Sequence, residues 1–157
     1  MRINLLCIGK TDDKKIGELI SYYIARLPKH WNFEIQEIPD VKNAKNLTPD
    51  LLKKEEAKLF NQYIDNTDLV VLLDEKGKEY TSREFAQKLN NWQNNSVKKI
   101  CFLIGGAYGF ADEIYSRANE KLSLSKMTFT HQMIRLFFVE QIYRADQILQ
   151  GKPYHND

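Results

Sequence analysis

The sequence predicts an α/β fold: a mostly parallel sheet with helices on both faces. Short apolar segments of strand length alternate along the chain with longer segments whose apolar residues recur at helical spacing. The segment DLVVLLD, residues 68–74, is almost continuously apolar, which is typical of a strand covered on both faces. Strands and helices in this alternating order favour a doubly wound, parallel sheet.

The elements follow from local patterns. Strands are expected at residues 2–9, 32–39, 68–74 and 97–104, with a further strand-like segment at 121–127. Helices are expected at residues 12–27, 48–64, 81–91, 111–119 and 130–150. Thr48 followed by Pro49 is a strong helix start, and Thr81 with Glu84 forms a capping box. Between the third strand and that capping box, the segment DEKGKEY is predicted to turn the chain.

Length and composition exclude several classes of protein. A chain of 157 residues fits one domain, so we expect a single domain over residues 1–157. With 43% hydrophobic and 28% charged residues it is typical of globular proteins, and it has no apolar run long enough to span a bilayer. The formal net charge of +2 permits an RNA partner without requiring one.

The opening residues and the cysteines both indicate a cytoplasmic protein. The apolar part of MRINLLCIGK is too short for the core of a signal peptide and is interpreted as a buried first strand. Cys7 and Cys101 lie in predicted buried strands, where an unpaired thiol behaves as a small apolar side chain. We therefore expect neither a disulfide nor a metal site.

The last predicted helix is apolar around more than half of its circumference. A helix that packs on one sheet face needs an apolar stripe only about 100° wide. The extra apolar surface is either buried deep within the domain or covered by a partner. In a chain of this size we favour a homodimer.

The segment FLIGGAYGF, residues 102–110, places three glycines after an apolar strand. It lacks the Lys and Ser/Thr of a phosphate-binding P-loop, and it follows the fourth strand rather than the first, which argues against a dinucleotide fold. Two interpretations remain: a tight turn without a ligand, or a bare backbone that approaches an adenine or a ribose. Ligands of α/β sheets bind beyond the carboxyl ends of the strands, which favours the second.

Five motifs together closely resemble the RlmH family of SPOUT methyltransferases. They are LLDEKGK, LIGGAYGF, LSLSKMTFTHQMIR, VEQIYRA and KPYH. The resemblance implies S-adenosylmethionine as cofactor and methylation of N3 of a pseudouridine in large-subunit (23S) ribosomal RNA. It also implies a homodimer and a SPOUT-type fold with a C-terminal trefoil knot, which no hydrophobic pattern would indicate.

The resemblance also assigns a cofactor site. Its residues here are Leu73, Gly105, Leu122, Ser123, Leu124, Ser125, Lys126 and Met127. The segment LSLSKM is expected to contribute mainly through its backbone, with Leu73, Leu122 and Met127 flanking the adenine. Without the resemblance, LSLSKM would be interpreted as an ordinary half-buried strand.

The catalytic candidates lie near the end of the sequence. His155 is the expected general base, because histidine titrates near neutral pH, and Tyr154 is expected to stack on the target base or to donate a hydrogen bond to it. Without the resemblance this segment would be a frayed end. Many family members have Arg or Lys after the histidine, whereas Asn156 and Asp157 follow here.

The RNA-binding candidates are Arg135, Arg144 and Lys152. Arg144 lies four residues after Glu140, so a simple pair within the helix is the alternative. His131 either orients the cofactor or RNA, or caps the last helix. A small, nearly neutral protein holds a long RNA weakly, which favours the assembled ribosome as substrate. A SPOUT enzyme acting on tRNA or another RNA, and a non-catalytic ribosome-binding module, are the two alternative functions.

Overall fold

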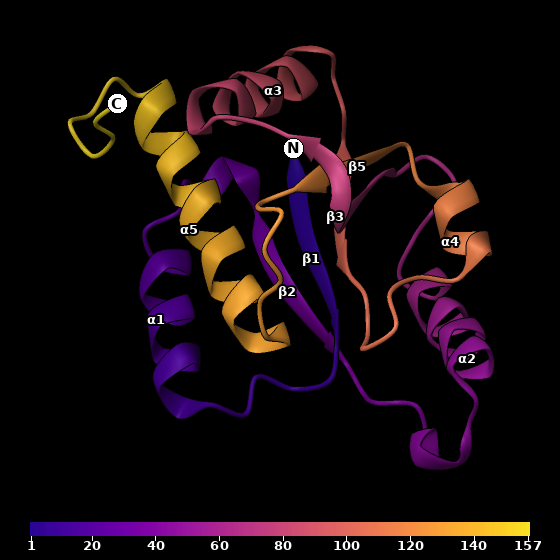
Figure 1. Ribbon diagram of the computed structural model, residues 1–157. Coiled ribbons are helices and arrows are strands. Elements are labelled where there is room, and N and C mark those ends of the chain that lie inside the picture. Colours follow the sequence, from indigo (N-terminus) through magenta and orange to yellow (C-terminus); the bar gives the residue numbers. More distant parts are fainter.

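The computed structural model describes residues 1–157 and contains one sheet with helices on both sides (Figure 1). The strands are β1 (Arg2–Ile8), β2 (Phe33–Ile38), β3 (Leu69–Glu79), β4 (Lys99–Ile104) and β5 (Glu120–Ser123). The helices are α1 (Lys14–Ile24), α2 (Pro49–Asn61), α3 (Ser82–Asn94), α4 (Asp112–Arg117) and α5 (His131–Leu149). All five strands are parallel, in the order β2-β1-β4-β3-β5, which confirms the predicted fold class.

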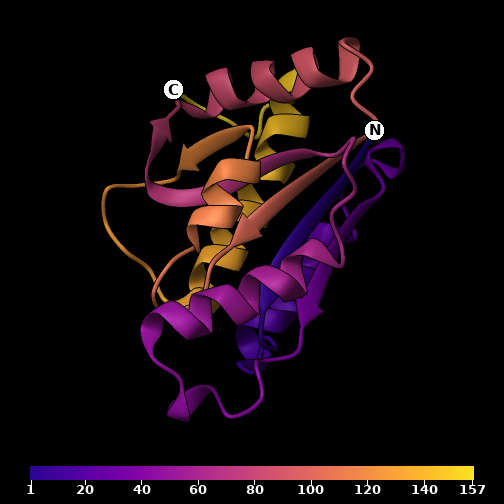
Figure 2. The ribbon, with the colours of Figure 1, turned by 90° about the vertical axis from the view of Figure 1, so that its right-hand side faces the viewer.

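Alternate residues of the central strands face two separate cores. On β1, Leu5 faces the core formed with α1, α3 and α5, whereas Leu6 faces the core formed with α2 and α4. Figure 2 looks onto the side covered by α2 and α4. Cys7 and Cys101 are buried and unpaired, as predicted, and burial raises the pKa of both thiols to about 12.

The predicted helix starts are confirmed. Thr48 accepts a hydrogen bond from the Leu51 amide at the start of α2. At the start of α3, Thr81 and Glu84 form the complete capping box, with distances of 3.2 and 2.7 Å. These contacts are local, because each joins residues three positions apart, so the sequence alone is enough to indicate them.

Two strand boundaries differ from the prediction. β3 does not end at residue 74. After an irregularity it continues to Glu79, so that Leu122 of β5 pairs with both Leu73 and Lys78 of β3. Gly77 makes this possible, because a Cβ at that position would lie 2.6 to 2.7 Å from backbone atoms of Lys121 and Leu122. β5 itself ends at Ser123, and residues 124–130 form a loop instead of extending the strand.

None of the helices combines the length and the apolarity that a bilayer crossing needs. The trefoil knot implied by the family resemblance stays a prediction.

The close approach at Gly77 leads to a test of stability. Gly77→Ala should lower the free energy of unfolding by about 1–3 kcal/mol, because the new methyl group meets backbone that has no room to move. Gly17→Ala is the matched control: Gly17 lies in α1 with no atom within 4 Å of the new Cβ, so the change should stabilise the protein by about 0.5–1 kcal/mol. Thermal unfolding of both variants measures the difference. Equal midpoints would contradict the close approach of Gly77 to the β5 backbone.

Candidate active site

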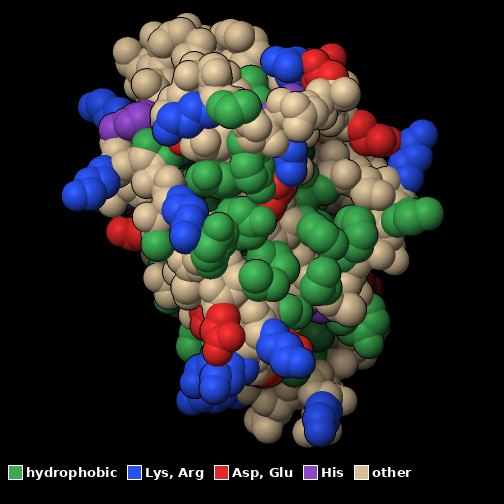
Figure 3. Space-filling model, turned by 90° about the vertical axis from the view of Figure 1, so that its left-hand side faces the viewer, with side chains coloured by type: hydrophobic (Ala, Val, Ile, Leu, Met, Phe, Trp, Pro, Cys, Tyr) green, Lys and Arg blue, Asp and Glu red, His purple; other side chains and the backbone are tan.

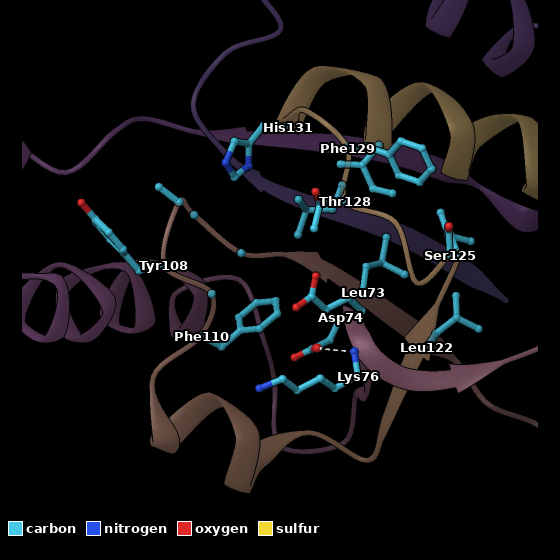
Figure 4. A pocket seen from close by; sticks show the side chains of 18 of the residues that line it. Leu73, Asp74, Lys76, Tyr108, Phe110, Leu122, Ser125, Thr128, Phe129 and His131 are labelled. Carbon is cyan, nitrogen blue, oxygen red and sulfur yellow. Dashed lines mark hydrogen bonds between the residues drawn. The ribbon is translucent and has the colours of Figure 1, made fainter.

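At one edge of the sheet, the ends of β4 and β5 and the irregular segment of β3 after Leu73 border a cavity. Leu73 of β3 is in register with Ile104 of β4 on one side and with Leu122 of β5 on the other. A cavity of about 510 Å³ lies beyond this row, a volume within the usual range for small-molecule sites (Figure 4). Its walls come from residues 73–76 of β3, the loop after β4 and the loop after β5.

The glycine loop forms one wall of the cavity through its backbone. The Gly109 amide donates to the Gly106 carbonyl at 3.1 Å and closes a tight turn, and Gly109 has a φ of +79°. A Cβ at Gly105 would lie 3.2 Å from Gly109 backbone atoms and 3.3 Å from the Phe110 ring. Glycine at these positions therefore lets main-chain groups come close to each other and to the cavity.

The loop after β5 forms the opposite wall, and its own hydroxyl groups shape it. The Ser123 hydroxyl donates to the Ser125 carbonyl, and the Ser125 hydroxyl accepts from the Met127 amide, both at 2.9 Å. Met127 is 77% exposed, so its side chain is free to close over a bound molecule. Thr128, Phe129 and His131 continue this wall to the start of α5 (Figure 4).

Most of the predicted cofactor residues lie together. Those that line the cavity are Leu73, Gly105, Leu122, Leu124, Ser125 and Met127. Ser123 is buried and faces a neighbouring hollow, and the Lys126 ammonium lies 3.8 Å from Glu79 on the surface. The structure thus brings six of the eight residues to one cavity, and their cofactor role stays a prediction.

Sequence reasoning missed an acidic residue of the cavity. Asp74 accepts hydrogen bonds from the Tyr115 hydroxyl at 2.6 Å and from the Lys76 amide at 2.8 Å. Burial and the neighbouring Asp74 carboxylate raise the pKa of Tyr115 to about 12, so its hydroxyl stays a donor at neutral pH. Its place in the sequence was the signal that could have identified it, because Asp74 directly follows the most apolar stretch of β3.

The tail, residues 151–157, folds back onto α5. The Tyr154 hydroxyl donates to Glu140 at 2.9 Å, and Glu140 also pairs with Arg144. The Tyr154 ring packs against Tyr143 with centroids 4.9 Å apart. Burial and hydrogen bonds to Tyr23 and Glu140 raise the pKa of Tyr154, so Tyr154 is a neutral hydrogen-bond donor in this arrangement.

His155 lies between two charged groups. Its Nδ1 is 3.3 Å from the Arg144 guanidinium, and its Nε2 is 2.9 Å from Asp157 Oδ1. Asp157 also pairs with Arg83 at 2.7 Å, and these two contacts lower the pKa of its carboxyl group. Asp157 therefore fastens the tail to Arg83 of α3.

The tail does not reach the cavity of its own chain. No residue of the tail lines the cavity, whereas His131, at the other end of α5, does. The tail packs against Glu140, nine residues further along, which corresponds to about 14 Å of helix. Figure 1 shows the tail at the opposite end of α5 from the loop after β5. His155 and the cavity are thus apart within one chain.

The three RNA candidates lie in different environments. Arg135 is only 2% exposed, and its guanidinium donates to the Ile8 carbonyl at 2.8 Å and to the Thr11 hydroxyl at 2.9 Å. Two of its guanidinium N–H groups are thus used within the chain, and its role in RNA binding stays a prediction. Arg144 forms the expected pair with Glu140, and Lys152 is exposed.

Apolar side chains gather on the face formed by α1 and α5 (Figure 3). The exposed members on these helices are Leu19, Tyr22, Phe137 and Leu149, each 38 to 49% exposed. Phe137 packs on Phe129, which also lines the cavity, so this apolar surface reaches the edge of the site. A contiguous apolar face of this kind is typical of a protein contact.

Comparison with known sequences gives consistent matches over the whole chain. A family model described as "Predicted SPOUT methyltransferase" matches residues 1–155. Proteins named "Ribosomal RNA large subunit methyltransferase H" are 50% identical in Cytophaga hutchinsonii, 49% in Christiangramia forsetii and 48% in Parabacteroides distasonis. These alignments cover 99 to 100% of this chain and 99 to 100% of each relative.

A solved structure shares the fold. The structure of a probable methylase family protein from Haemophilus influenzae matches with a TM-score of 0.59 at 12% sequence identity. The match covers 95% of this chain and 66% of that protein's chain.

The structural role of Arg135 is testable by substitution. Arg135→Met should lower the free energy of unfolding by about 1–3 kcal/mol, because the Ile8 carbonyl loses its donor. Lys152→Met, at an exposed position, should change it by less than about 0.5 kcal/mol. Chemical denaturation measures both. Unchanged stability of Arg135→Met would show that the side chain does not hold the end of β1.

Proposed function

The chain belongs to the SPOUT methyltransferase family, and from this premise we propose that it methylates N3 of a pseudouridine in large-subunit (23S) ribosomal RNA. The proposed methyl donor is S-adenosylmethionine. The observation that carries the proposal is the cavity at the carboxyl edge of β3, β4 and β5, lined by six residues that the family resemblance assigns to the cofactor. The relatives' name supplies the substrate class.

The cavity suits a nucleoside without phosphates. Leu73 and Leu122 offer apolar surface for an adenine, and the glycine loop offers backbone groups for its edge and for the ribose. S-adenosylmethionine supplies a methyl group on a positively charged sulfur. Asp74, held by Tyr115, places a carboxylate in the same cavity, where it favours a cationic ligand.

The chemistry requires alignment and a base. The pseudouridine nitrogen between two carbonyls is a weak acid that loses its proton as the methyl group arrives. Holding the reacting atoms in line supplies up to about 7–11 kcal/mol in favourable cases. His155 is proposed to take the proton at Nδ1, whose lone pair accepts from Arg144 in the free chain, because Nε2 carries the hydrogen that it donates to Asp157. Tyr154 is proposed to stack on the target base or to donate a hydrogen bond to it.

A homodimer would bring the base and the cavity together. His155 is far from its own cavity, and the apolar face of α1 and α5 extends from the tail region to Phe129 at the edge of the cavity. We therefore propose that two copies pack through this face and that the tail of each copy lies over the cavity of the other.

The assembled ribosome is the proposed substrate, which places the reaction in the cytoplasm. A net charge of +2 provides little electrostatic hold on a long free RNA, so a shaped particle surface is favoured. The exposed Lys152, the partly exposed Arg144 and the buried Arg135 are the proposed contacts to phosphate.

The substrate experiment measures transfer of labelled methyl groups to ribosomes, isolated large subunits, bare ribosomal RNA and tRNA, followed by mapping of the modified nucleoside. We expect transfer to the ribosome and label on N3 of a pseudouridine. Gly105→Val is the control, because its side chain meets Gly109 and Phe110 and should abolish cofactor binding in calorimetry while the protein stays folded. Label on tRNA alone would favour a SPOUT enzyme that acts on tRNA. No transfer to any RNA would favour a non-catalytic ribosome-binding module.

The position of the base is testable with mixed dimers. His155→Ala should slow single-turnover transfer by about 10²- to 10⁴-fold and leave cofactor affinity unchanged. Mixing His155→Ala with Gly105→Val subunits should restore roughly a quarter of wild-type activity, because half of the dimers are mixed and each contains one intact site. A mixture as inactive as the two variants alone would contradict a tail that acts on the partner's cavity.

A further inference from the structure

Glu56 of α2 lies directly beneath the glycine loop. It is 6% exposed, and a Cβ built at Gly106 would lie 2.5 Å from its Oε2 and 2.7 Å from its Cδ. Gly106 does not have a positive φ, so its backbone would accept any L-residue. The glycine at position 106 is therefore required by the Glu56 carboxylate and not by the turn.

The carboxylate lies against Gly106, whose N–H lowers its pKa, and no cation lies within salt-bridge distance of it. Burial raises the pKa of Glu56, the Asp40 carboxylate raises it further, and the Gly106 N–H opposes both. Because the folded state holds the proton more tightly than the unfolded state, stability falls as pH rises from the ordinary glutamate pKa through the raised one. Above that raised pKa the ionised group thus costs stability, which points to a role other than holding the fold together.

Gly106 thus has neighbours on two sides. The Glu56 carboxylate lies against it in the layer below, and its carbonyl accepts from the Gly109 amide across the turn. Residues 105–110 all line the cavity, so the position of this wall depends on Gly106. An unanchored loop of three glycines would lose conformational entropy on binding a ligand, and a fixed one would not.

We propose that Glu56 is a positioning residue for the cofactor: by binding the Gly106 amide it fixes the glycine loop in the conformation that receives S-adenosylmethionine. The inference rests on the proposed function, in which this loop binds the cofactor. Glu56 does not touch the cavity itself, and it acts through Gly106.

Calorimetric titration with S-adenosylmethionine tests the role. Glu56→Leu removes the acceptor at similar volume and should weaken binding about 10- to 100-fold, the loss expected for a hydrogen bond to a charged group. Glu56→Gln keeps an acceptor oxygen and should stay within about threefold of wild type. Glu55→Leu is the matched control on the same helix, because Glu55 is 42% exposed and pairs with Lys58, and it should bind like wild type.

Two measurements on the protein without cofactor separate this role from general packing. The thermal midpoint of Glu56→Leu should equal or exceed that of wild type, because a buried charge is replaced by an apolar group. Hydrogen exchange of the Gly106 amide, followed by NMR, should accelerate in Glu56→Leu and not in Glu56→Gln.

A double-mutant cycle adds an internal check. Gly106→Ala should weaken binding in the wild-type background, because its methyl group meets the Glu56 carboxylate, and should add little to Glu56→Ala, where that carboxylate is gone.

Three results would overturn the inference: wild-type affinity in Glu56→Leu, a fall in thermal midpoint with unchanged affinity, or unchanged exchange of the Gly106 amide. In each case wild-type binding of S-adenosylmethionine would still support the proposed function. Failure of the wild-type protein to bind the cofactor would instead overturn the proposed function, and this inference with it.

Discussion

The site depends on the register of three parallel strands. Because Leu73, Ile104 and Leu122 pair in one row, the segments that follow β3, β4 and β5 begin at the same edge and enclose one cavity. The same pairing makes Gly77 necessary. After the irregularity that follows Leu73, β3 pairs with β5 again through Lys78, and at Gly77 it passes directly against the β5 backbone. One row of paired residues therefore fixes both the floor of the cavity and the backbone that frames it.

Buried charged groups hold two of the surrounding segments from opposite layers. Arg135, from α5, binds the carbonyl of Ile8 at the end of β1, and Glu56, from α2, lies against Gly106 after β4, whose amide it is proposed to bind. Apolar packing is not directional, so it positions helices on a sheet but does not set the course of a loop. Hydrogen bonds from buried charges are directional and strong, and they restrict each loop to one conformation.

Sequence reasoning succeeded where the determining contacts are local or repetitive. The strands follow from apolar runs, and the starts of α2 and α3 follow from capping contacts between residues three positions apart. It failed where the contact partner is distant. The continuation of β3 depends on β5, and the burial of Arg135 depends on a carbonyl 127 positions earlier. The expected cofactor residues came from motif resemblance, because LSLSKM is expected to contribute through its backbone and so gives no side-chain signal.

The separation of His155 from the cavity has a chemical consequence. Within one chain, the Tyr154–Glu140 and Asp157–Arg83 contacts hold the tail away from the cavity, so an isolated subunit has no His155 beside the proposed cofactor site. If the partner's tail completes the site, dimer formation brings His155 of one copy to the cavity of the other. An isolated monomer would then be inactive. The same contacts that fold the tail onto α5 in cis then position His155 over the neighbouring cavity in trans, because α5 lies in the proposed interface. In the proposed dimer, Tyr154 of the tail and Arg144 of α5 would therefore belong to the active site of the other subunit.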